Sequence, residues 1–147
     1  MFETIVVGTD GSETASEAVR QATDLARTCG GGTTLHLVTA YRPLESMYVA
    51  PDVVPSGLAG LVDPRGEART VVEEAADKVR AEGVEVETYV WPGDPASAII
   101  DVATTTKADV IVVGSRGMSG AARFLLGSVP NKVSHHAPCN VLIVRTC

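Results

Sequence analysis

Aromatic residues are scarce in this chain of 147 residues: Phe, Trp and Tyr together make up 4%, and there is a single tryptophan. Basic residues are also few, with 12 Lys and Arg against 18 Asp and Glu, which leaves a net charge of −6. This balance argues against a nucleic-acid partner, because such proteins usually present a basic face. It leaves open a small anion held by local donors.

Long apolar runs and paired cysteines are missing as well. No run approaches the roughly 20 residues of a membrane span. The start, MFETIVVGTD, has neither the basic residues nor the cleavage site of a signal peptide. Cys29, Cys139 and Cys147 give an odd count, which suits a reducing compartment. We therefore expect a cytoplasmic protein without a membrane partner.

The chain does contain alternating short apolar strands and amphipathic helices, which suit a single globular domain over residues 1–147. Strands are expected at residues 3–9, 35–40, 84–91, 108–113 and 140–145. The alternation predicts a doubly wound α/β fold, with a five-stranded parallel sheet in the order 3-2-1-4-5 and helices on both faces. Trp91-Pro92 is expected to end the third strand and to pack. Residues 41–65 form a long loop, for which a surface loop and a lid are both open interpretations.

Two glycine-bearing loops leave the strands that flank the point where such a sheet reverses direction. Residues 8–12, GTDGS, follow the first strand, and residues 114–129, GSRGMSGAARFLLGSV, follow the fourth. Ligands of doubly wound sheets bind at this position. Glycine reaches positive φ and lets a ligand approach main-chain N–H groups closely, so an anion cradle is one interpretation and a tight turn is the other.

Two common phosphate motifs are absent. Neither G-x-x-x-x-G-K-[ST] nor a G-x-G-x-x-G after the first strand occurs, which excludes an ordinary P-loop and the dinucleotide fingerprint. The spacing that occurs is G-x-x-G, nine residues, then G-S: Gly114, Gly117 and Gly127-Ser128. Ser128 is expected to cap the last helix, whose N-terminus favours negative charge. Arg116 and Arg123 are the only cations expected nearby, a modest supply for a triphosphate.

With VVGTDGS near its start and VGSRGMSGAARFLLGSVPNKVSHHAPCNVLIV at its end, the chain resembles the universal stress protein family over essentially its whole length. The G-2x-G-9x-G-[ST] spacing is the ATP-binding motif of that family, so the resemblance implies its ATP-binding branch. It also implies an adenine-nucleotide α-hydrolase-like fold and, usually, a homodimer.

The resemblance implies roles for particular positions. Gly8, Thr9 and Asp10 would lie at the ribose and adenine side, and backbone groups of Leu37 or Val38 would meet the adenine edge. The residues that would wrap the ribose and phosphates are Gly114, Ser115, Arg116, Gly117, Met118 and Gly120, with Gly127, Ser128 and Val129 at the phosphate tail. A carboxylate such as Asp10 suits a ribose diol, and beside a phosphate it would need a bridging Mg²⁺. Because few cations are expected near the site, a bound Mg²⁺ remains one alternative. Cyclic AMP remains another, as a less favoured ligand than ATP.

Catalysis has little support in the sequence. No Ser-His-Asp arrangement or dedicated general base can be recognised, and no catalytic residue is assigned. His135 and His136, adjacent on a helix, point about 100° apart, so no resident metal site is expected. The favoured function is a nucleotide-dependent regulator in a stress response. The alternatives are a slow ATPase or phosphotransferase that uses the same pocket, and a cyclic AMP-binding protein.

The last strand suggests self-association. Residues 141–144, VLIV, are apolar, yet the predicted order places strand 140–145 at the sheet edge. An exposed apolar edge strand invites pairing with another chain. Antiparallel pairing with the same strand of a second copy would satisfy the N–H and C=O groups of this edge under two-fold symmetry. The competing interpretation is that the 41–65 loop or the final helix covers this edge in a monomer.

Overall fold

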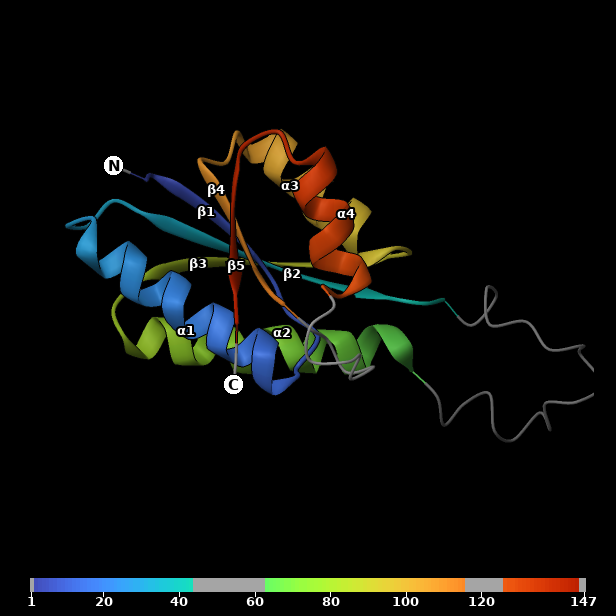
Figure 1. Cartoon of the computed structure of the whole chain (residues 1–147). Coiled ribbons are helices and arrows are strands. Elements are labelled where there is room, and N and C mark those ends of the chain that lie inside the picture. Colours follow the sequence, from blue (N-terminus) through green and yellow to red (C-terminus); the bar gives the residue numbers. More distant parts are fainter. Residues whose placement is uncertain (1, 44–62, 116–125, 146–147) are drawn as a thin grey trace, which may run out of the picture.

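The computed structural model describes residues 2–43, 63–115 and 126–145. Its strands are β1 (Thr4–Gly8), β2 (Thr34–Tyr41), β3 (Glu85–Pro92), β4 (Val110–Gly114) and β5 (Asn140–Val144). Its helices are α1 (Glu13–Thr28), α2 (Pro64–Ala81), α3 (Pro95–Thr106) and α4 (Ser128–His136). These elements follow one another along the chain in the predicted order (Figure 1).

The five strands form one parallel sheet in the order β3-β2-β1-β4-β5, which confirms the predicted topology. β1 lies at its centre, and Ile5, Val6 and Val7 are completely buried, as expected for a strand with both faces covered. From β1 the chain adds β2 and β3 on one side of the sheet, and it then returns to the other side of β1 to add β4 and β5. The carboxyl ends of β1 and β4, at Gly8 and Gly114, therefore lie on the same edge of the sheet.

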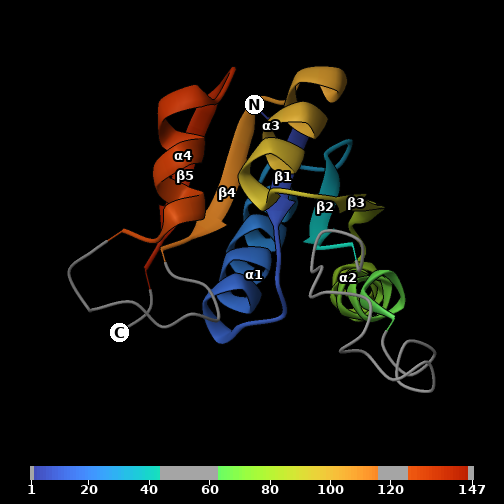
Figure 2. The ribbon, with the colours of Figure 1, turned by 90° about the vertical axis from the view of Figure 1, so that its right-hand side faces the viewer.

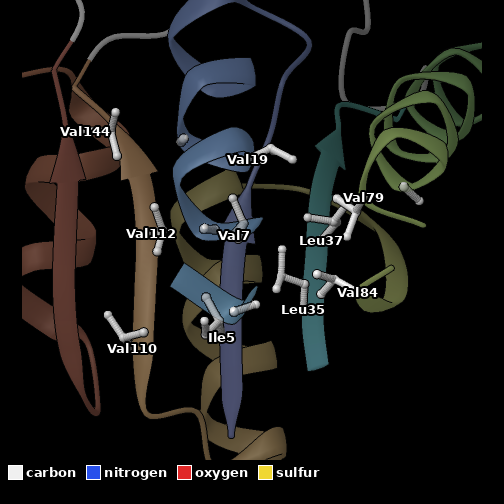
Figure 3. Packing of buried hydrophobic residues seen from close by; sticks show 14 of the residues in the cluster. Ile5, Val7, Val19, Leu35, Leu37, Val79, Val84, Val110, Val112 and Val144 are labelled. Carbon is white, nitrogen blue, oxygen red and sulfur yellow. The ribbon is translucent and has the colours of Figure 1, made fainter. Parts of the chain in front are cut away.

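Helices α1 and α2 cover one face of the sheet, and α3 and α4 cover the other (Figures 1 and 2). On the first face, α1 residues such as Val19 and α2 residues such as Val79 pack on the sheet residues Ile5, Leu37 and Val112 (Figure 3). The opposite core joins α3 and α4 to the other side of the same strands. Burial on both faces is what the apolar runs of the inner strands predict.

Helix starts follow local sequence. Asp94 caps α3, as aspartate before proline predicts: its carboxylate accepts a hydrogen bond of 2.9 Å from the Ser97 amide, and Pro95 occupies the first turn. At α1 the cap is Ser12, whose hydroxyl accepts from the Ala15 amide at 3.2 Å. Ser12, and not the nearby Asp10, is therefore the N-cap of α1.

The two edge strands differ in chemistry. β3 carries Glu85 and Glu87 and ends at Pro92, features that discourage pairing with another chain. β5 has an apolar sequence, NVLIV, and Leu142 is 40% exposed. Trp91-Pro92 ends β3 as predicted, but Trp91 packs only in part: it is 48% exposed, because an outermost strand is covered less completely than a central one.

Within the described ranges, none of the helices combines the length and apolarity needed to cross a bilayer. The predicted 41–65 loop lies mostly outside the described residues. At its two ends it is shorter than expected, since residue 41 belongs to β2 and residues 64 and 65 begin α2.

Candidate functional site

A crevice of about 290 Å³ lies at the carboxyl edge of the sheet, between the ends of β1 and β4. The residues that line it are Gly8, Thr9, Asp10, Ala15, Val38, Ala40, Pro95, Ile99, Val113, Gly114, Gly127, Ser128, Val129 and Pro130. This volume lies at the lower end of the range of about 300–1,000 Å³ that is typical of small-molecule sites. The crevice occupies the position where the topology predicts a ligand.

Most of the site residues expected from the sequence meet there. The end of β1 contributes Gly8, Thr9 and Asp10, β2 contributes Val38, and β4 contributes Gly114; the segment 127–129 closes the other side. Leu37 does not take part through its side chain, which is fully buried in the core under α1 and α2. Arg116, Gly117, Met118, Gly120 and Arg123 lie outside the described residues.

The turn after β1 is held by hydrogen bonds to β2. The Thr9 amide donates to the Val38 carbonyl at 2.9 Å, and the Thr39 hydroxyl donates to the Thr9 carbonyl at 2.7 Å. One residue later, Asp10 Oδ1 accepts from the Ser12 amide at 2.9 Å. The turn therefore links β2 to the first turn of α1, and it holds the Asp10 carboxylate at the exposed mouth of the crevice.

The opposite wall joins the two ends of the glycine segment. The Gly127 amide donates to the Ser115 carbonyl at 2.9 Å, and the Ser115 amide donates to the Val144 carbonyl at 2.8 Å. The predicted role of Ser128 as a helix cap is wrong. Gly127 is the N-cap of α4 and Ser128 is its first helical residue, with no side-chain cap bond. The helix begins one residue earlier than its sequence suggests, so Ser128 lines the crevice instead.

Three helices begin beside the crevice. Ala15 lies in the first turn of α1, Pro95 is the first residue of α3, and Ser128 is the first residue of α4. A helix N-terminus presents unpaired N–H groups and the positive end of the helix dipole. Ser12 and Asp94 already accept from first-turn amides of α1 and α3, whereas α4 has no side-chain cap. The start of α4 is therefore the part of the crevice that favours an anionic group.

A salt bridge joins the starts of α3 and α4. Lys132 Nζ lies 2.8 Å from Asp94 Oδ2 and 3.0 Å from Ser97 Oγ. The hydrogen bond from Lys132, together with the one from the Ser97 amide, lowers the pKa of Asp94 below its ordinary value. Lys132 is two residues beyond Pro130, which lines the crevice, but it is not itself a lining residue, and its ammonium is paired with Asp94.

Two of the glycines are required by space and not by a positive φ. A Cβ on Gly8 would overlap Ile99 Cδ1, and a Cβ on Gly114 would lie 2.5 Å from Thr14 Cγ2 and 3.0 Å from the Thr14 backbone. α1 and α3 thus approach the strand ends closely, which narrows the crevice to a slot.

Sequence reasoning missed the apolar part of the lining. These residues are Ala15, Ala40, Pro95, Ile99, Val113 and Pro130. In the sequence they resemble ordinary core positions, so only the packing distinguishes them. Among the described residues that line the crevice, Asp10 is the one that is charged. The described residues as a whole contain no group of three or more His, Cys, Asp or Glu able to hold a metal ion. The site thus combines one carboxylate and helix N-termini with a mostly apolar wall.

Comparisons with known proteins agree with this architecture. The model of the Universal stress protein family matches residues 1–145. Universal stress protein Rv1636 of Mycobacterium tuberculosis is 36% identical over 151 residues, which cover 99% of this chain and 97% of that protein.

Two solved structures extend the comparison. A universal stress protein in complex with cAMP has a TM-score of 0.72 and 36% identity, and the match covers 99% of both chains. Universal stress protein UspA from Lactobacillus plantarum has a TM-score of 0.79 and 28% identity, with 97% of both chains covered.

Proposed function

Because this chain belongs to the universal stress protein family, we propose that it binds an adenine nucleotide in the crevice between β1 and β4 and acts as a nucleotide-dependent regulator in a stress response. The observation that carries this proposal is the convergence of the Thr9–Asp10 turn with the starts of α1, α3 and α4 around one small space. The cAMP complex of a universal stress protein that is 36% identical to this chain supports it.

Each part of the nucleotide has a counterpart in the crevice. The Asp10 carboxylate suits a ribose diol, because one carboxylate can accept hydrogen bonds from both hydroxyls. The start of α4, at Ser128, suits a phosphate, because it carries the positive end of the helix dipole and has no side-chain cap. The apolar surface of Val38, Ala40 and Ile99 suits the base.

ATP is the first candidate, because the spacing Gly114, Gly117, Gly127-Ser128 is that of the family's ATP-binding motif. A bound Mg²⁺ would supply charge neutralisation, and Asp10 is the lining residue suited to contact it. Cyclic AMP is the second candidate, favoured by the relative that was solved with it. A slow ATPase or phosphotransferase activity is the enzymatic alternative for the same pocket.

Mass spectrometry of small molecules released from the purified protein tests the proposal, together with calorimetric titrations of ATP, AMP and cyclic AMP. We expect one adenine nucleotide per chain and negligible ATP turnover. Sustained ATP turnover would favour the enzymatic alternative. Failure of all three nucleotides to bind would contradict the proposal.

We also propose that the chain forms a homodimer through β5, which would place the apolar edge of the sheet against its symmetry mate. A cytoplasmic location is part of the same proposal, since an odd number of cysteines suits a reducing compartment.

A further inference from the structure

The single tryptophan of the chain lies next to the crevice, although it is absent from the crevice lining. In the parallel register of β2 and β3, Trp91 pairs with Ala40, which lines the crevice. Residues paired in register on neighbouring strands project to the same face of a sheet. Trp91 therefore shares a face with Ala40, on the side covered by α3 and α4.

Trp91 is not used by the core on that face. Tyr89, two residues earlier on β3, packs against the core cluster under α3, whereas Trp91 is 48% exposed. The exposed part of the indole is therefore available to contact a ligand that lies beside Ala40.

The backbone that follows Trp91 is held in place. The Gly93 amide donates to the Tyr41 carbonyl at 2.8 Å, and Gly93 has a φ of 107°, a value that favours glycine. Asp94 then caps α3 and is bonded to Lys132. Since the next residue, Pro95, lines the crevice, the segment from β3 to α3 is fixed at the edge of the site.

The order of the strands along the crevice indicates which part of a bound nucleotide would contact the indole. One end of the crevice is the start of α4 beyond β4, where the proposed function places the phosphates, and the opposite end is at Val38 and Ala40 on β2. β3 is the next strand in that direction. A nucleotide with its phosphates at α4 therefore extends its base toward Trp91.

We propose that Trp91 stacks on the purine base of the bound nucleotide and so extends the crevice onto β3. This inference rests on the proposed function. The described residues that line the crevice include no aromatic side chain, and Trp91 supplies a flat π-surface beside them. Stacking of a base on an aromatic ring is tolerant of the base's identity, which leaves recognition of adenine to hydrogen bonds elsewhere in the site.

The test uses the full-length protein and its only tryptophan as a reporter. AMP should change the tryptophan fluorescence on binding, and calorimetry should show that Trp91→Ala weakens AMP by about tenfold. Trp91→Phe retains an aromatic ring and should recover most of this loss. Ribose 5-phosphate, which lacks a base, should bind the wild type and Trp91→Ala equally. Glu85→Ala removes an exposed side chain at the other end of β3, outside the crevice lining, and serves as the control.

The outcomes separate this inference from the proposed function. Equal AMP affinity of the wild type and Trp91→Ala would overturn the stacking role and leave nucleotide binding intact. A change of oligomeric state in Trp91→Ala at unchanged affinity would overturn it too, by assigning the indole to a protein interface. Absence of adenine-nucleotide binding to the wild type would overturn both.

Discussion

The amide of Gly127 donates a hydrogen bond of 2.9 Å to the carbonyl oxygen of Ser115, so the two ends of the glycine segment meet although eleven residues separate them in the sequence. Ser115 in turn donates to Val144 at the end of β5. The start of α4 is thereby tied to the carboxyl ends of β4 and β5. The predicted consequences of this arrangement can be measured.

Gly127→Val should abolish nucleotide binding and leave the fold largely intact. Gly127 has φ −61° and ψ 164°, an extended conformation that valine adopts readily. Gly127 lines the crevice, so a branched side chain there should occupy space that a phosphate needs at the start of α4. Circular dichroism and calorimetric titration with ATP measure the two effects. Unchanged ATP affinity in a folded variant would contradict the phosphate role of α4.

Asp10→Ala should weaken ATP by about tenfold to a hundredfold, the range expected for loss of a charged hydrogen-bond acceptor. The matched control is Asp101→Ala, an exposed carboxylate on α3 outside the crevice lining. Calorimetry on the two variants compares the same chemical change at two places. Equal effects would mean that the ligand lies somewhere else.

Gly8→Ala should lower the free energy of unfolding by about 1–3 kcal/mol, because the added methyl group overlaps Ile99 Cδ1. Ile99→Val removes the overlapping carbon, so the double variant should regain part of the loss. Urea denaturation of the two single variants and the double variant gives the coupling energy. Strictly additive effects would show that the two residues do not compete for this space.

Leu142→Lys should separate a β5-mediated dimer, since Leu142 is 40% exposed on the edge strand and lysine there would face its symmetry mate. Ile143 is a less suitable target, because it packs against the core under α3 and α4. Glu85→Lys, on the opposite edge, is the control. Light scattering that finds a monomeric wild type, or a dimeric Leu142→Lys, would exclude this interface.

Acid should destabilise the protein partly through His36. This side chain is 8% exposed, and its Nδ1 lies 2.9 Å from the Tyr89 hydroxyl. Burial lowers the pKa of His36 below its ordinary value, although the nearby Glu87 acts in the opposite direction. Between the lowered and ordinary pKa values, the unfolded chain binds more protons. The free energy of unfolding therefore decreases as the pH falls through the ordinary pKa of histidine.

Urea denaturation at about pH 7.5 and about pH 5.5 measures this effect across the usual titration range of histidine. His36→Gln should reduce the difference in stability between the two conditions. His135→Gln, an exposed residue of α4, should leave that difference unchanged. A wild-type difference that persists in His36→Gln would assign the acid sensitivity to other groups.

Local sequence determined much of this protein. The spacing of apolar residues predicts the helices and strands, and their alternation predicts the sheet order that the structure has. The start of α3 at Asp94-Pro95 was predictable because a cap depends on residues within one turn. The meeting of the two glycine loops followed from topology alone.

Only the tertiary structure decided which apolar residues line the crevice and which fill the core. Ile99 and Ile100 read alike in the sequence, yet only Ile99 reaches the crevice. Lys132 and Asp94 pair across 38 positions, and Trp91 is exposed because β3 is the outermost strand. These properties depend on how helices pack on a finished sheet, a long-range effect that periodicity along the chain does not encode.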